Sequence, residues 1–245
     1  MNKIKIEIYR SMEVMGLKEA EYIAELIQTK KNPLLCIPAG SSAECVFSAL
    51  VKLYEEGKVS FKDVKFVGLD EWYDYDRYEG TCRWMLDNAL FKHIDVKEEN
   101  MCFFNSNPEN IEKECSEMEK FIKDNGGIDY LLLGVGMNGH LALNEPGCDK
   151  HGRAHSCNLA EKTKEVSAKY FDYKTQLKYG ITLGIENFRE AKETVVIFNC
   201  ERKADIFEQF MKSAPTNKLP VSLVKEFDNA RVITDLLAAS KVYSE

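Results

Sequence analysis

The sequence is poor in the features that mark membrane, secreted and nucleic-acid-binding proteins. No apolar run approaches the ~18 residues that a spanning helix needs, and the start MNKIKIEIYR lacks the apolar core of a secretory signal. The formal net charge of -7 offers no basic stripe for a nucleic-acid backbone. We therefore expect a cytoplasmic protein that binds neither membranes nor nucleic acid.

Cysteine pairs at metal-binding or redox spacing are also missing. The eight cysteines are scattered over the chain, and none lies in a CxxC pair. A free cysteine behaves as a small buried hydrophobe. The sequence therefore predicts reduced, structural thiols, with no disulfide framework and no metal site.

Signs of a domain boundary are absent as well. The 245 residues contain no internal repeat, no low-complexity tract and no linker rich in Pro, Gly or Ser. With 44% hydrophobic and 30% charged residues, the composition is that of a globular protein with a sizeable core. We predict one domain over residues 1–245.

Short apolar runs rich in β-branched residues alternate with longer amphipathic stretches, which is typical of strands joined by crossover helices. The predicted strands are 4–9, 34–38, 64–69, 101–104, 130–133, 181–184, 195–199 and 231–234. The predicted helices are about 12–28, 42–56, 80–91, 108–125, 161–169, 202–212 and a last one from about 235. This order predicts an α/β fold of three layers, α/β/α, with a mostly parallel, Rossmann-like sheet. The aperiodic segment 146–160 is expected to be a loop or lid beside the site.

Two polar clusters directly follow predicted strands, where open α/β sheets bind their ligands. Residues 38–43, PAGSSA, follow LLCI and open a helix. Their backbone N–H groups can cradle a phosphate, or the segment is a tight turn with a serine N-cap. Asp70 and Glu71 follow the next strand, where neighbouring side chains point in different directions. Asp70 is the candidate general base and Glu71 has a structural role, or both belong to a solvated acidic turn.

The most informative stretch is 134–147, GVGMNGHLALNEPG, which follows the strand YLLL. Three glycines within six residues indicate a tightly turned backbone close to a ligand. His140 can exchange a proton near neutral pH, and Glu145 can orient or charge-stabilise its imidazole. A single histidine is more often structural, but its place in this glycine loop favours a functional role.

Two lysines are candidates for phosphate binding. Lys169 lies in SAKYF, and Lys203 lies in CERKAD just after the strand VVIFN. A cation at a strand end can pair with a phosphate dianion. Solvated surface lysines are the ordinary alternative.

Taken in this order, the clusters resemble the glucosamine-6-phosphate deaminase family, which shares its fold with the 6-phosphogluconolactonases. The resemblance covers nearly the whole chain. Its sharpest parts are LDEW at 69–72, GVGMNGHLALNEPG at 134–147, ITLGIENFREAKETVVIF at 181–198 and ERKA at 201–204. LDEW with GTC at 80–82, and NGHLALNEPG, are more similar still to the galactosamine-6-phosphate isomerase or deaminase branch.

The resemblance implies a cofactor-free enzyme that converts glucosamine or galactosamine 6-phosphate to a ketose 6-phosphate with loss of ammonia. Asp70 would move a proton between C2 and C1, His140 would be the ring-opening acid, Glu145 would support it, and Asn138 belongs to the same catalytic loop. The implied substrate and phosphate contacts are Ala39, Gly40, Ser41, Ser42, Glu71, Gly136, Lys169 and Lys203. The partner is a small sugar phosphate, and the protein is expected to be a monomer or a small homo-oligomer.

Two positions depart from the family pattern. Lys169 aligns with a phosphate-binding arginine, and lysine cannot make the bidentate contact of arginine. Asn138 stands where glucosamine enzymes carry Asp, so Glu145 is expected to be the only acid near His140.

Two other functions compete with deamination. Lactone hydrolysis belongs to the same fold family, although its usual DGHTAS-like loop differs from the loop at 134–147. A sugar-phosphate sensor domain would bind without turnover, but it would normally carry a DNA-binding module.

Overall fold

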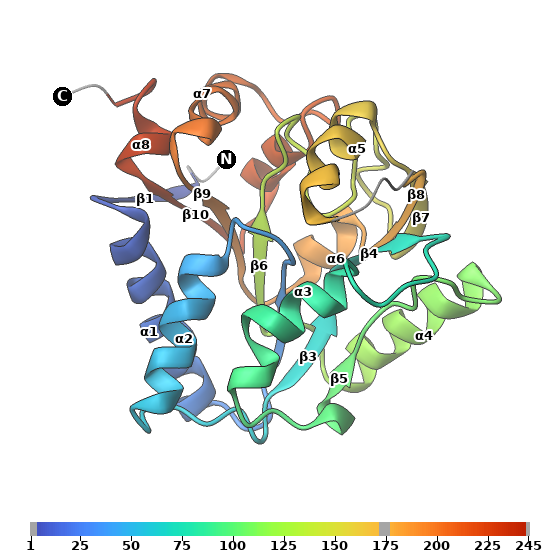
Figure 1. The fold of residues 1–245 in the computed structure, drawn as a ribbon. Coiled ribbons are helices and arrows are strands. Elements are labelled where there is room, and N and C mark those ends of the chain that lie inside the picture. The colour runs from blue at the N-terminus through green and yellow to red at the C-terminus, as the bar shows by residue number, and fades with distance from the viewer. Residues whose placement is uncertain (1–3, 172–176, 244–245) are drawn as a thin grey trace.

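The computed structural model describes residues 4–171 and 177–243, apart from the side chain of Lys169. Its centre is a seven-stranded sheet in the order β1-β10-β9-β6-β2-β3-β5, and every neighbouring pair is parallel (Figure 1). The strands are β1 Lys5–Tyr9, β2 Leu34–Ile37, β3 Lys65–Gly68, β5 Met101–Cys102, β6 Tyr130–Gly134, β9 Thr194–Phe198 and β10 Ala230–Asp235. Helices cover both faces of this sheet, which confirms the predicted three-layer α/β/α fold.

Successive residues of the central strands pack on opposite faces of the sheet. In β2, Leu34 and Cys36 belong to one apolar core, whereas Leu35 and Ile37 belong to the other. Each strand must therefore be apolar on both sides, and this explains the continuous apolar runs of the sequence.

The two faces are covered by different helices. The face of Leu35 packs against α1 Met12–Thr29, α2 Glu44–Glu55 and part of α3 Cys82–Ala89. The opposite core contains residues of α4 Ile111–Asp124, α6 Ile185–Glu190, α7 Ala204–Lys212 and α8 Leu236–Ala239. Serine, threonine, asparagine or aspartate side chains cap α1, α3, α4 and α8, as expected for helix starts that need hydrogen-bond acceptors.

A second, antiparallel sheet lies beside the first and corrects three predictions. It contains β4 Asp70–Tyr73, β8 Tyr179–Thr182 and β7 His155–Asn158 in the order β4-β8-β7. The predicted strand 181–184 is therefore β8 and lies outside the parallel sheet. Asp70 and Glu71 belong to the strand β4, so the alternative of a solvated acidic turn is wrong, and segment 146–160 contains β7 and is not all loop. The small sheet lies next to α5 Glu161–Ser167, on the side of the molecule away from β1 (Figure 1).

Short 3-10 helices complete the described part of the chain. They are η1 Phe91–His93, η2 Glu98–Asn100, η3 Ala168–Tyr170, η4 Glu201–Lys203 and η5 Pro220–Glu226. Among the described residues, no helix combines the length and the apolarity of a membrane span. The single domain over residues 1–245 stays a prediction.

Candidate active site

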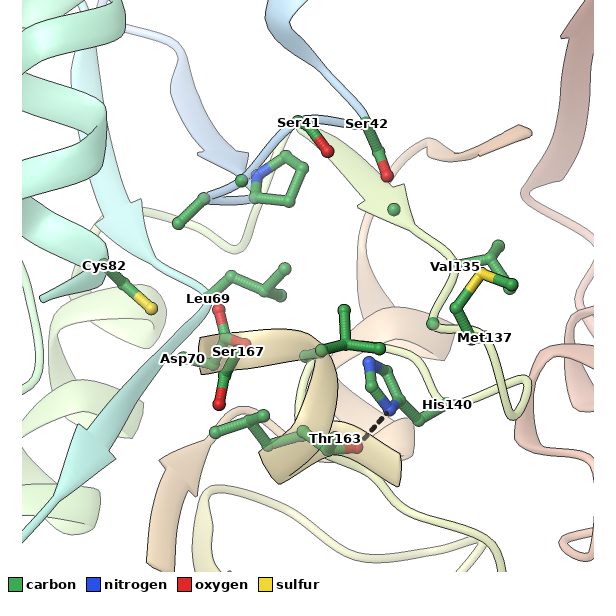
Figure 2. A pocket seen from close by; sticks show the side chains of 18 of the residues that line it. Ser41, Ser42, Leu69, Asp70, Cys82, Val135, Met137, His140, Thr163 and Ser167 are labelled. Atoms are coloured by element: carbon green, nitrogen blue, oxygen red, sulfur yellow. Dashed lines mark hydrogen bonds between the residues drawn. The ribbon is translucent and has the colours of Figure 1, made fainter. Parts of the chain in front are cut away.

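A cavity of about 140 Å³ opens at the carboxyl ends of β2, β3, β6 and β9. It brings together residues that are far apart in the sequence, from the turn after β2, the start of β4, the loop after β6 and helix α5 (Figure 2), and also from the segment after β9. The predicted site residues that line it are Ala39, Gly40, Ser41, Ser42, Asp70, Gly136, Asn138, His140 and Lys203. Glu71 and Glu145 lie behind the cavity wall, and the side chain of Lys169 lies outside the described residues.

The turn after β2 is built for close approach to a ligand. Gly40 has a φ of 89°, a left-handed conformation that favours glycine. The N-cap of α2 is Ala43, whose side chain cannot accept a hydrogen bond, so the alternative of a serine N-cap is wrong. Asn199 fixes the turn by donating a hydrogen bond of 2.8 Å to the Ser42 carbonyl. The N–H groups of the first turn of α2 therefore have no capping side chain to compete with an anion.

Asp70 is the first residue of β4 and faces the cavity. Its carboxyl group is surrounded by protein, and this burial raises its pKa to about 6, against the opposing effect of the charge on His140. A carboxylate with a pKa close to neutrality is suited to general-base catalysis.

Glu71 is not among the residues that line the cavity, and its implied substrate contact stays a prediction. Its side chain is 2% exposed and accepts hydrogen bonds from the backbone N–H groups of Trp72, Cys82 and Arg83 at 2.8, 2.8 and 3.1 Å. Burial raises its pKa to about 7, although these donors oppose the shift. The physical reason is the alternation of β4, which turns adjacent side chains to opposite sides. Through these hydrogen bonds Glu71 holds the start of α3 in place, which is the structural role expected for it from the sequence.

The loop after β6 holds His140 against Gly136. A Cβ atom built on Gly136 would lie 2.2 Å from Nε2 of His140, so only glycine leaves room for the imidazole. The backbone closes the loop with a hydrogen bond of 3.0 Å from Gly136 N–H to the His140 carbonyl, and Gly139 adopts a φ of 82°. The glycines therefore determine where the histidine ring lies.

Glu145 supports His140 from behind. Its Oε2 lies 3.3 Å from Nδ1 of His140 and accepts a hydrogen bond of 2.8 Å from the Asn138 amide. Burial alone would raise the pKa of Glu145, but the contact with His140 and the other donors outweigh burial and lower it to about 2. Glu145 is therefore an ionised acceptor at neutral pH.

Asn138 joins the parts of this loop. Besides donating to Glu145, it accepts a hydrogen bond of 3.2 Å from the backbone N–H of His140. The expectation that Glu145 is the only acid near His140 is wrong, because Asp70 also lies close enough to interact with His140 electrostatically.

Lys203 lines the same cavity as the turn after β2. Its Nζ donates a hydrogen bond of 2.5 Å to the Val135 carbonyl, which ties it to the His140 loop. The cation and the turn together form a region suited to a phosphate group.

Sequence reasoning missed the wall that α5 and η3 supply. Thr163, Val166, Ser167 and Tyr170 all line the cavity. Their spacing of i, i+3, i+4 and i+7 places them on one helical face, and this periodicity was the signal that could have revealed them. Cys82 and Lys162 also line the cavity and were not predicted.

The described residues contain no group of three or more His, Cys, Asp or Glu side chains arranged to hold a metal ion. The cavity instead combines a carboxylate, an imidazole with its own carboxylate support, and an anion-binding turn with a lysine. Such a set can move protons on a bound phosphorylated ligand.

Comparison with known proteins relates the chain to enzymes of sugar phosphates. Residues 12–233 match the family model described as glucosamine-6-phosphate isomerases/6-phosphogluconolactonase. The chain is 34% identical to a glucosamine-6-phosphate deaminase of Shouchella clausii, over 100% of this chain and 98% of the relative. It is 30% identical to that of Halalkalibacterium halodurans, over 98% of each protein.

Solved structures agree with this relationship. A monomeric glucosamine-6-phosphate deaminase superposes with a TM-score of 0.92 at 26% identity, covering 97% of this chain and 100% of that chain. The 6-phosphogluconolactonase of Trypanosoma brucei has a TM-score of 0.72 at 16% identity, covering 98% and 99%. At this lower identity the lactonase shares the fold, and nothing more follows from it.

Proposed function

Because the chain belongs to the family of glucosamine-6-phosphate isomerases and 6-phosphogluconolactonases, we propose that it converts an amino-sugar 6-phosphate to a ketose 6-phosphate and ammonia. The observation that carries the proposal is one cavity in which Asp70 and His140 lie beside the anion-binding turn 39–42 and Lys203. The relatives of 30–34% identity named glucosamine-6-phosphate deaminase support the same activity.

The phosphate group binds at the turn 39–42. Backbone N–H groups at the start of α2 and the charge of Lys203 stabilise the dianion there. Binding energy gained at the phosphate holds the reacting carbons, several bonds away, against Asp70. Unphosphorylated amino sugars are therefore expected to be poor substrates.

The first chemical step opens the sugar ring. The protonated imidazole of His140 gives a proton to the ring oxygen while solvent water takes the proton of the C1 hydroxyl, so that the C1–O5 bond breaks and an aldehyde forms. Glu145, ionised behind the ring, stabilises the charge on the imidazole.

The second step transfers a proton between carbons. The carboxylate of Asp70 removes the proton from C2 while solvent gives a proton to O1, which yields an enol-amine, and Asp70 then delivers its proton to C1. Water then adds to the resulting imine at C2 and ammonia leaves, so that one water is consumed for each ketose 6-phosphate formed. These steps require only acid–base side chains, and the absence of a cofactor remains part of the proposal.

Lactone hydrolysis is the activity from which deamination must be separated, since both occur in the family description. The similar lactonase structures are only 15–17% identical to the chain and support the fold alone. A binding-only sensor would use the same phosphate region but would leave Asp70 without a chemical role.

The decisive experiment is an ammonia-release assay with glucosamine 6-phosphate and galactosamine 6-phosphate side by side, with 6-phosphogluconolactone hydrolysis measured in parallel. We expect ammonia and a ketose 6-phosphate from one or both hexosamines. The ratio of the two kcat/KM values identifies the preferred C4 epimer. Lactone hydrolysis without ammonia release would contradict the proposal, as would tight binding of both hexosamines without turnover.

A cytoplasmic location and a monomeric or small homo-oligomeric state belong to the same proposal. The monomeric deaminase with a TM-score of 0.92 supports the smallest of these assemblies. Light scattering of the purified chain during size-exclusion chromatography measures its mass directly.

A further inference from the structure

Thr163 is the shortest described hydrogen-bond contact of the His140 imidazole. Its Oγ1 lies 3.1 Å from Nδ1, compared with 3.3 Å for Oε2 of Glu145 (Figure 2). The residue belongs to α5, not to the His140 loop, and its side chain is buried, with 6% exposed. A buried hydroxyl placed on a catalytic ring nitrogen affects which nitrogen carries the proton.

We propose that Thr163 is a positioning residue that holds the imidazole proton of His140 on Nδ1 and thereby keeps Nε2 available to exchange a proton with the substrate. The effect of Thr163 on catalysis rests on the proposed function, whereas the position of the imidazole proton does not depend on it.

The donors and acceptors around Nδ1 lead to this assignment. Glu145 is ionised, because its pKa is lowered to about 2, and an ionised carboxylate can only accept. Nδ1 therefore has to be the donor toward Glu145, and the Thr163 oxygen shares that proton. The hydroxyl hydrogen of Thr163 is then free to point to Glu145, a bond that contributes to the low pKa of Glu145.

The position of α5 depends on the same carboxylate. Oε1 of Glu145 accepts a hydrogen bond of 3.1 Å from the backbone N–H of Ala160, the N-cap residue of α5. One carboxylate oxygen of Glu145 thus binds the start of α5, and the other contacts the imidazole of His140. Thr163, in the first turn of α5, contacts the same imidazole nitrogen. This arrangement sets the distance between Thr163 and Nδ1 without a contribution from bound substrate.

The direct test is ¹⁵N NMR of histidine-labelled protein, which distinguishes the two neutral imidazole tautomers. The chain has only four histidines, so the signal of His140 can be assigned by its loss in His140→Gln. In the neutral form of the imidazole we expect wild-type His140 to carry its proton on Nδ1. Thr163→Val and Thr163→Ala remove the nearer of the two acceptors of the Nδ1 proton and leave only the longer contact with Glu145. They should therefore shift His140 toward a mixture of tautomers, whereas Thr163→Ser should keep the wild-type state.

The kinetic test separates positioning from binding. For Thr163→Val we expect kcat to fall about tenfold, the effect of losing one hydrogen bond, with KM changed less than about twofold. Thr163→Ser should restore kcat. Thr194→Val is the matched control, because it removes another buried hydroxyl, which donates to the Phe188 carbonyl at the opposite end of the sheet. It should lower stability and leave kcat and the His140 tautomer unchanged.

An unchanged tautomer in both Thr163→Val and Thr163→Ala would overturn the proposal. So would a serine variant that behaves like the valine variant, since this would show that the methyl group and not the hydroxyl matters. If no hexosamine phosphate is turned over at all, the proposed function fails while the NMR comparison still decides the role of Thr163.

Discussion

At the scale of single residues, the site depends on the separation of two adjacent carboxylates. Asp70 faces the cavity, and Glu71 on the other side of β4 accepts three backbone N–H groups around the start of α3. Asp70 is thus the candidate base, while the adjacent Glu71 holds the start of α3 in place beside the cavity. The sequence already predicted that these two side chains point in different directions, and the strand that begins at Asp70 gives the physical reason.

The pKa of Asp70 predicts the acidic limb of the activity profile. A base must be deprotonated, and burial raises this pKa to about 6. We expect kcat/KM to fall tenfold per unit of pH below this value on the acidic side of its profile. The check is the pH dependence of kcat/KM, and a midpoint near 4, the value of an ordinary aspartate, would contradict the role of Asp70.

Asp70→Asn is the companion variant. It should lower kcat by a factor of about 10²–10⁴, the usual cost of losing a general base, and it should still be protected by inorganic phosphate against thermal unfolding. Retention of most of kcat would show that another group removes the proton.

Lys203 is expected to act on binding and not on chemistry. Lys203→Ala removes the cation near the turn 39–42 and should raise KM for the phosphorylated substrate about tenfold or more, with a smaller change in kcat. Inhibition by inorganic phosphate should weaken in parallel. If both KM and phosphate inhibition were unchanged, the phosphate group would have to lie elsewhere in the cavity.

At the scale of elements, α1 and α2 pack so closely that one glycine is required between them. A Cβ atom on Gly16 would lie 2.5 Å from the backbone oxygen of Cys45, and a backbone atom cannot move aside as a side chain does. Gly16→Ala should therefore lower the free energy of unfolding by about 1–3 kcal/mol, although alanine favours a helix. Urea denaturation measures the change. Lys18→Ala on the exposed side of α1 serves as the control, with an expected effect within about 0.5 kcal/mol.

The elements of the central sheet could be predicted because buried parallel strands are apolar on both sides. The runs at 34–38, 130–133 and 195–199 coincide with β2, β6 and β9 to within a residue. The small sheet could not be predicted in this way. Its strands DEWY and HSCN are short and polar, and they pair with β8 over long sequence separations that local patterns do not report.

The same reasoning applies to the elements of the site. Residues that follow strands were predictable, since carboxyl ends of parallel strands meet at one edge. Thr163 could not be predicted, because its contact with His140 depends on how α5 packs over that edge of the sheet. A hydrogen bond between Glu145 and Ala160 sets this packing.

At the scale of the whole molecule, one arginine joins three elements on the side of the sheet away from the cavity. Arg231 of β10 makes two hydrogen bonds, of 2.8 and 2.6 Å, to Glu19 of α1, which is 2% exposed and also accepts from Tyr130 of β6. Arg231→Met should lower the free energy of unfolding by about 3–5 kcal/mol, because it leaves a buried carboxylate without its cation.

Chemical denaturation of Arg231→Met and of the double variant with Glu19→Gln checks this interpretation. The double variant should recover part of the loss, since the glutamine side chain carries no charge. Equal stability of wild type and Arg231→Met would show that the pair contributes nothing, and kcat should be unaffected in both variants.

The order of the central sheet also bears on how the chain reaches its fold during synthesis. Among the strands that the structure describes, the edge strand β1 pairs only with β10, in a register that runs from Lys5↔Arg231 to Tyr9↔Asp235. On the ribosome, residues 5–9 emerge long before residues 230–235, so β1 stays without its neighbour while the intervening chain is made. Joining them closes a loop of more than two hundred residues, a non-local step that slows folding. Until then β1 and β9 each present an unpaired edge, and a nascent chain stalled before residue 230 is expected to depend on chaperones.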